Sequence, residues 1–305
     1  MSREESGNYV LKTENLTKLY GSHRAVNAVN IHVKKGDIYG FIGKNGAGKS
    51  TLMKMVAGLV AQSGGKIELF GSSDIEKQRI RVGSLIENPG LYPGMTAAEN
   101  LEIYRRAYGI ANKSIISDTL DFIGLGDTGK KKVGKFSMGM KQRLGIAIAL
   151  LKSPDFLILD EPINGLDPVG IREVREFLTA LNREKNITIM ISSHILGELS
   201  KIATTYGIIR DGELVEEFGA GELSMRCRRC QKLVVSNAER AVNILEEELG
   251  IKEFDVPEAF VIRIYEHLED IAEINHRLLL GGIEIKESYL AGQDLESYFM
   301  ERIGN

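Results

Sequence analysis

The sequence predicts an α/β fold over residues 1–220, followed by a small α+β domain over residues 221–305. Short apolar runs alternate with helical patterns in the first part, which is typical of a mixed sheet with crossover helices. A glycine-rich loop joins one of these runs to a helical pattern. The charge balance also changes from slightly basic to acidic near residue 220, which favours a domain boundary there.

The composition limits the possible classes of protein. With 43% hydrophobic and 27% charged residues, the chain is neither collagen-like nor disordered. Two cysteines cannot build a disulfide framework, so we expect a reducing compartment. The longest apolar runs fall short of the ~20 residues that a bilayer span needs, and we expect no secretory leader. A net charge of −3 argues against a nucleic-acid partner.

The first elements surround the glycine-rich loop. Val26–Val33 alternates apolar and polar residues, which predicts a half-buried strand. Asp37–Ile42 is a short apolar run that predicts a buried strand. Lys49–Gly58 has helical spacing and a glycine at its end, so we expect a helix there.

A helical insert follows and then the sheet pattern returns. Glu99–Tyr108 and Ser114–Ile123 predict two helices without a strand between them, within a helical subdomain of about residues 88–152. The apolar runs Phe156–Leu159 and Thr188–Ile191 predict buried parallel strands. Pro168–Glu184 lies between them and predicts a helix with proline in its first turn.

The segment 221–305 repeats the alternation on a smaller scale. We expect strands and helices in turn over Lys232–Val235, Ala238–Leu249, Ala259–Tyr265, Leu268–Leu280, Ile283–Lys286 and Asp294–Ile303. No catalytic group of residues is recognisable there, and stabilisation of a dimer, contact with a partner protein and regulation all stay open as roles. Cys227 and Cys230 have the spacing of a redox or half-zinc pair, but no second pair lies nearby. A structural role, a redox role and a zinc shared across a dimer are the alternatives.

The glycine-rich loop matches the pattern G-x-x-x-x-G-K-[ST] in full, between a strand and a helix. Glycines let successive backbone N–H groups point at one phosphate, and the helix N-terminus adds its dipole. Lys49 is expected to reach the β- and γ-phosphates, and the Ser50 hydroxyl to bind Mg²⁺. The predicted nucleotide-binding residues of this segment are Gly43, Lys44, Asn45, Gly46, Ala47, Gly48, Lys49, Ser50 and Thr51.

Two acids end the apolar run Phe156–Leu159. Ligands bind outside the carboxyl ends of the strands of a parallel sheet, so we expect these acids beside the phosphate-binding loop. Asp160 is suited to hold Mg²⁺, and Glu161 is suited to polarise the attacking water as a general base.

Together these segments resemble the ATP-binding subunit of an ABC transporter over roughly residues 9–218. Ser137-Met138-Gly139-Met140-Lys141-Gln142-Arg143 is similar to the signature motif, Gly165-Leu166-Asp167-Pro168 to the D-loop and Ser192-Ser193-His194 to the switch histidine. The resemblance implies that Tyr20 stacks on adenine and that His194 contacts the γ-phosphate. It also implies that two subunits pair head to tail, so that Ser137 and Gly139 of the signature helix contact the partner's ATP, and that Asp167 of the D-loop is a nucleotide-site residue.

Glu87 stands in the segment 82–89, where the family usually has the glutamine of its Q-loop. A carboxylate still offers an oxygen to Mg²⁺ or to the lytic water, but it adds negative charge beside the γ-phosphate. Glu87 is therefore a candidate metal ligand and catalytic residue, with neutral drift as the alternative. A glutamate here, together with the signature and D-loop sequences, is similar to bacitracin- and lantibiotic-type export ATPases. The chain length fits the bacitracin type better.

The resemblance implies an ATPase that uses ATP and Mg²⁺, forms a homodimer and binds a separate membrane-spanning permease at the cytoplasmic face of the membrane. The helical insert Glu99–Gly124 and the loop Glu87–Tyr92 are the expected docking region. A general exporter of drugs, lipids or sodium is the alternative within transporters. A soluble non-transport ABC ATPase and a module that holds ATP without hydrolysing it are alternatives of other classes.

Overall fold

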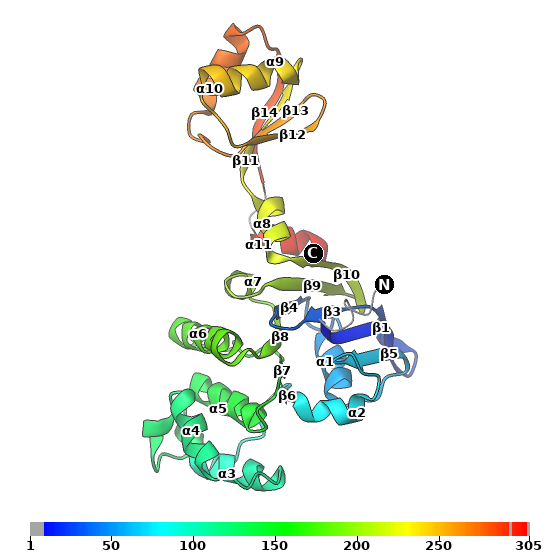
Figure 1. The fold of residues 1–305 in the computed structure, drawn as a ribbon, viewed down its shortest axis with the longest axis vertical. Coiled ribbons are helices and arrows are strands. Elements are labelled where there is room, and N and C mark those ends of the chain that lie inside the picture. Colours follow the sequence, from blue (N-terminus) through cyan, green and yellow to red (C-terminus); the bar gives the residue numbers. More distant parts are fainter. Residues whose placement is uncertain (1–8, 293–294, 304–305) are drawn as a thin grey trace. The chain divides into compact units, whose positions relative to one another are not determined.

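Residues 9–292 and 295–303, which a computed structural model describes, form two units (Figure 1). The first runs to Ala220 and takes in the chain from Met300 onward, and the second comprises Gly221–Phe299. We expected one module over residues 221–305, so the boundary differs at the C-terminal end. In the first unit, the Arg302 guanidinium lies 2.9 Å from the Glu216 carboxylate, and the Arg302 carbonyl accepts a hydrogen bond from Arg210 (3.0 Å).

The first unit contains a six-stranded sheet with the order β10-β9-β4-β8-β7-β6. Every neighbouring pair is parallel except β10 and β9. The central strands are buried on both faces, which is why their sequences are mostly apolar. The strands are β4 (Ile38–Ile42), β6 (Val82–Leu85), β7 (Phe156–Leu159), β8 (Thr188–Ser193), β9 (Thr205–Arg210) and β10 (Glu213–Gly219). The mixed α/β fold is therefore confirmed, and the carboxyl ends of β4, β7 and β8 meet at one edge.

An antiparallel sheet faces the first one and consists of β1 (Tyr9–Tyr20), β2 (His23–Val29), β3 (His32–Lys34) and β5 (Gly64–Leu69). The expectation of a single strand over Val26–Val33 is wrong. The segment forms two strands, β2 and β3, with a break in the strand structure between Val29 and His32. The buried Thr13 hydroxyl fills the break: it donates to the Val29 carbonyl (2.9 Å) and accepts from the Ile31 N–H (3.0 Å). Each short strand then pairs with a different part of β1.

One hydrophobic core joins the two sheets and α1 (Lys49–Ala57). Leu52, Met53 and Met55 of α1 are fully buried in it. The other helices of this part are the short α2 (Ile75–Gln78) and α7 (Leu196–Leu199), and the long α6 (Pro168–Lys185), which begins at the predicted proline.

The helical subdomain comprises α3 (Ala97–Ala107), α4 (Ser114–Phe122) and α5 (Met138–Leu150). Its three helices share a second core that contains Leu101, Leu120 and Leu144. A capping box starts α3: the Thr96 side chain accepts from the Glu99 N–H, and the Glu99 carboxylate accepts from the Thr96 N–H. Two helices expected from sequence thus form where the spacing predicted them.

The second unit has the element order β-α-β-β-α-β, with an antiparallel sheet in the order β12-β13-β11-β14. This is the split βαβ arrangement of ferredoxin-like modules. A π-helical turn, Ile244–Glu248, continues α9, where we expected one regular helix over Ala238–Leu249. The elements are β11 (Cys230–Val235), α9 (Ala238–Asn243), β12 (Phe254–Glu258), β13 (Val261–Ile264), α10 (Ile271–Leu280) and β14 (Ile285–Ala291), with α8 (Ala220–Cys227) before them and α11 (Leu295–Ile303) after them. Asp294, the expected start of the last helix, lies outside the described residues.

Candidate active site

The phosphate-binding loop joins the end of β4 to the start of α1 at the carboxyl edge of the six-stranded sheet. Gly48 takes a left-handed conformation (φ +106°), and a Cβ there would lie 2.4 Å from the Ala25 carbonyl oxygen. A Cβ at Gly43 would lie equally close to the Ile209 carbonyl oxygen. Only glycine therefore lets the loop pack this closely against its neighbouring strands.

The loop borders a cavity of about 330 Å³. Nine of the predicted site residues line it, from the loop, from the start of α1 and from the ends of β1 and β7. Sequence reasoning missed His23 and Ala25, which follow Tyr20 at the start of β2. The lining residues are Tyr20, His23, Ala25, Lys44, Asn45, Gly46, Gly48, Lys49, Ser50, Thr51 and Glu161.

Lys49 supplies a buried positive charge to the lining of this cavity. Its side chain is 5% exposed, and its Nζ donates to the carbonyls of Gly43 (2.5 Å) and Lys44 (3.1 Å). The Glu161 Oε1 lies 3.6 Å from the same Nζ. Burial lowers the pKa of Lys49, and the Glu161 and Asp160 carboxylates oppose that shift. The ammonium is thus oriented by carbonyls on one side and by acids on the other.

The two acids after β7 are fixed by Ser192 at the end of the neighbouring strand β8. The buried Ser192 hydroxyl donates to the Asp160 Oδ1 (2.6 Å) and accepts from the Glu161 N–H (2.8 Å). Glu161 adopts a left-handed conformation (φ +49°), so the extended backbone of β7 does not continue through it. Ser192 was singled out in the sequence only as a neighbour of His194. Its bridging position follows from the parallel pairing of β7 with β8.

The Glu161 carboxylate contacts two groups and keeps one oxygen without a hydrogen bond. Its Oε2 lies 2.7 Å from the Nδ1 of His194. Its buried Oε1 has no hydrogen-bond partner among the described residues. A buried acceptor with spare capacity at the wall of a polar cavity suits a ligand that brings a proton donor.

Glu87 lies outside this cavity. It stands in a left-handed turn (φ +64°) soon after β6, and its side chain is 64% exposed. Its Oε1 accepts a hydrogen bond from the Nζ of Lys54 (2.5 Å), a residue of α1 that sequence reasoning did not single out.

The expected signature and D-loop residues gather at a separate place from the phosphate-binding loop. Ser137 caps the N-terminus of α5 by accepting from the Met140 N–H (3.2 Å). Asp167 caps α6 in the same way by accepting from the Gly170 N–H (2.9 Å). A Cβ on Gly139 would lie 3.8 Å from the Gly170 Cα, so the two helix starts adjoin. Neither Ser137, Gly139 nor Asp167 lines the cavity beside Lys49.

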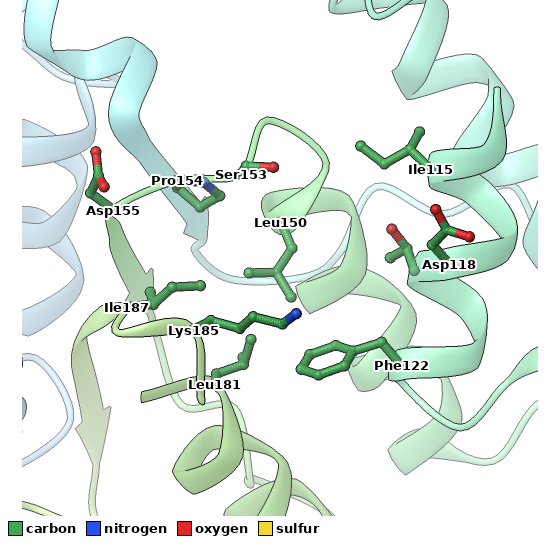
Figure 2. Close-up of a pocket in the computed structure, with 11 residues that line it drawn as sticks. Ile115, Asp118, Phe122, Leu150, Ser153, Pro154, Asp155, Leu181, Lys185 and Ile187 are labelled. Carbon is green, nitrogen blue, oxygen red and sulfur yellow. The ribbon is translucent and has the colours of Figure 1, made fainter. Parts of the chain in front are cut away.

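A second cavity, of about 420 Å³, lies between α4 of the helical subdomain and the start of β7 and end of α6 (Figure 2). Figure 2 shows Lys185 extending toward Phe122, and its Nζ lies 5.4 Å from the Phe122 ring centre. This second cavity borders the amino ends of β7 and β8, and none of the predicted site residues lines it.

The described residues of the second unit, like those of the first, form no metal centre. Over residues 9–292 and 295–303, no group of three or more His, Cys, Asp or Glu side chains is placed to hold a metal ion. Cys230 is buried in β11, and burial raises the pKa of its thiol.

None of the helices in the described part of the chain has the length and apolar character needed to cross a bilayer.

Comparison with known proteins agrees with this geometry. Residues 26–164 match the ABC transporter family model. The bacitracin transport ATP-binding protein BcrA of Bacillus licheniformis is 44% identical over 298 residues, 97% of each chain. The lantibiotic transport ATP-binding protein SrtF of Streptococcus pyogenes is 45% identical over 208 residues, 68% of this chain and 90% of its own. A solved ATP-binding subunit of an ABC transporter superposes with a TM-score of 0.61 at 28% identity, covering 71% of this chain and 92% of the other.

The matching fold, the phosphate-binding loop with its two acids and the 44% identity to BcrA over 97% of both chains lead to one conclusion. This chain belongs to the ATP-binding ATPase subunits of the ABC transporter family.

Proposed function

We propose that this chain is the ATP-hydrolysing subunit of an exporter that removes peptide antibiotics of the bacitracin or lantibiotic type. The extent of the likeness carries the proposal. BcrA matches 97% of both chains, so the match includes the second unit, whereas SrtF matches 68% of this chain. This difference favours the bacitracin type over the lantibiotic type.

The nucleotide would lie in the cavity beside α1. The backbone N–H groups of the phosphate-binding loop and the N-terminus of α1 bind the phosphates, and Lys49 neutralises the β- and γ-phosphates. Tyr20 lies at the cavity wall and is 49% exposed, so its ring is available to stack on adenine. His23 stands next to it, opposite Tyr20 in the pairing of β1 with β2.

Ser50 and Asp160 would hold Mg²⁺, with Glu87 as a further candidate ligand. A hydroxyl and carboxylates are the hard oxygen donors that this cation prefers. The fit is supported by the buried Asp160, whose carboxylate Ser192 holds and whose charge acts on Lys49, and by the buried Glu161 Oε1 without a hydrogen bond. When bound, the ion would offset the negative charge of the phosphate oxygens.

Glu161 would orient the attacking water and accept its proton. Its carboxylate is held on one side by His194 and lies within reach of Lys49 on the other. Ser192 fixes the backbone from which this side chain extends. A base oriented by neighbouring groups at a defined distance from the phosphate-binding loop is what in-line attack requires. In the closed site His194 would also contact the γ-phosphate.

A second copy would complete the site. Ser137 and Gly139 open a helix whose N-terminus is suited to bind an anion, yet they do not line the cavity of their own chain. Head-to-tail pairing would bring this helix and Asp167 to the partner's nucleotide.

A membrane-spanning permease would dock at the region 99–124 and the loop 87–92. This docking would place the chain at the cytoplasmic face of the membrane.

Deletion of this gene from its source strain tests the proposal. We expect greater sensitivity to bacitracin, or to a lantibiotic such as nisin, with unchanged sensitivity to ethidium and to sodium. The unaltered gene should restore resistance, and the Glu161→Gln variant, expressed at the same level, should not. Sensitivity to ethidium or sodium alone would indicate a general exporter. Unchanged sensitivity to every compound would refute transport of these substrates.

A further inference from the structure

An ion pair ties the loop after β6 to the helix that carries the phosphate-binding site. The Nζ of Lys54, in the last turn of α1, donates to the Oε1 of Glu87 at 2.5 Å. Lys54 is 26% exposed and Glu87 is 64% exposed. The backbone at Glu87 is left-handed (φ +64°), so the extended course of β6 does not continue through this residue. The carboxylate thus has a defined partner outside the cavity.

Lys54 stands one helical turn beyond Ser50 on α1. Side chains four residues apart lie on the same face of a helix, with Cβ atoms about 5–6 Å apart. The residue that holds the Glu87 carboxylate therefore lies on the same face of α1 as Ser50, one helical turn from it. A shift of the loop along this face of α1 toward the helix N-terminus would exchange one partner for the other.

We propose that Lys54 is a positioning residue that holds Glu87 outside the nucleotide site, and that Mg²⁺ at Ser50 competes with Lys54 for the carboxylate. The inference rests on the proposed magnesium site and deepens it. A glutamine in this position would carry no charge for Lys54 to attract, so the resting position depends on the glutamate. Because both side chains are partly exposed, solvent screens the ion pair. Little free energy is therefore lost when the carboxylate exchanges Lys54 for Mg²⁺.

Zero-length coupling with a carbodiimide reports the resting contact directly. The reagent joins a carboxylate to an amine only when the two touch, and mass spectrometry of the digested full-length chain measures the Lys54–Glu87 product. We expect the product without nucleotide and with ATP plus EDTA. We expect it to fall about fivefold or more with Mg²⁺ and a non-hydrolysable ATP analogue, since the equilibrium shifts to the bound position.

The pair Lys132–Glu99 is the matched control. It also joins a lysine to a glutamate 33 residues apart, at 3.1 Å, but it lies within the helical subdomain. Its coupling product should stay constant in all conditions. A Lys54–Glu87 product that is equally abundant with and without Mg²⁺ would overturn the inference, as would its absence in every condition while the control product forms.

A magnesium titration of analogue binding separates positioning from a structural role. Lys54→Met frees the carboxylate, so the Mg²⁺ concentration for half-maximal binding should fall about threefold. Lys54→Arg keeps the pair and should behave as the unaltered chain does. In a Glu87→Gln background, Lys54→Met should have no effect. An equal effect in that background would show that Lys54 acts on the phosphates and not through Glu87.

The two proposals fail in different ways. If the unaltered chain does not bind the analogue with Mg²⁺ at all, the proposed nucleotide site is wrong. If it binds normally while the Lys54–Glu87 product is unchanged, only the role of Lys54 is wrong.

Discussion

The Nδ1 of His194 lies 2.7 Å from the Oε2 of Glu161, so the residue after β8 contacts the acid after β7. The contact leaves Oε1 as the carboxylate oxygen without a hydrogen bond, 3.6 Å from the Nζ of Lys49. A single acid is thus held between two basic side chains at the edge of the cavity beside α1.

Replacing Glu161 with glutamine should stop hydrolysis while ATP binding persists. The amide keeps the shape and can still contact His194, but it cannot accept a proton from water. We expect ATP hydrolysis to fall by about 10²–10⁴-fold, and an ATP-bound dimer to accumulate on size-exclusion chromatography. ATP hydrolysis by the Glu161→Gln chain at the unaltered rate would show that Glu161 is not the general base.

Replacing Ser192 with alanine should impair hydrolysis more than binding. The change leaves the Glu161 N–H and the Asp160 carboxylate without a partner, and a buried unsatisfied group costs about 1–3 kcal/mol. Calorimetry should show a lower melting temperature, and steady-state assays a lower kcat.

Ser193→Ala is the control for Ser192. Ser193 is equally buried, but its hydroxyl accepts a hydrogen bond from the Ile195 N–H (2.9 Å). It should lose stability with little change in kcat. If both variants lose kcat equally, the bridge to the two acids has no special role.

Replacing Gly48 with alanine should disrupt the phosphate-binding loop. The left-handed backbone alone costs about 1–2 kcal/mol for a residue with a Cβ. The Cβ would also lie 2.4 Å from the Ala25 carbonyl oxygen, so the loop must shift. We expect a lower melting temperature and a loss of ATP-analogue binding in a fluorescence titration.

Gly109 provides the comparison for Gly48. It is also left-handed (φ +69°), but no atom lies within 4 Å of the position of a Cβ. Gly109→Ala should therefore show only the backbone cost and keep analogue binding. A Gly48→Ala chain that binds the analogue normally would contradict the close packing described here.

The Cys230 thiol should react slowly at neutral pH. Burial raises its pKa, so the thiol stays protonated at pH values where an ordinary cysteine, with a pKa of about 8.5, begins to ionise. In a Cys227→Ser chain, alkylation by iodoacetamide should accelerate only above that pH. Cys230→Ser measures the other thiol for comparison. Rapid alkylation of Cys230 at pH 7 would support the redox alternative instead.

The sequence alone determined the phosphate-binding loop and the buried strands beside it. These features depend on residues close together in the chain. Gly43, Gly48 and Lys49 lie within one short segment, and apolar runs such as Phe156–Leu159 are continuous. Local spacing also predicted α6 from its proline. A residue pattern that acts over one turn or one strand can be recognised without knowing what packs against it.

The tertiary structure decided which side chains meet. Ser192 bridges Asp160 and Glu161 because β7 and β8 are parallel neighbours, and Lys54 reaches Glu87 across 33 residues of chain. The break between β2 and β3 depends on Thr13, which lies on β1. Such contacts join residues distant in sequence, and no local pattern specifies them, because the strand order and the packing of α1 select the partners.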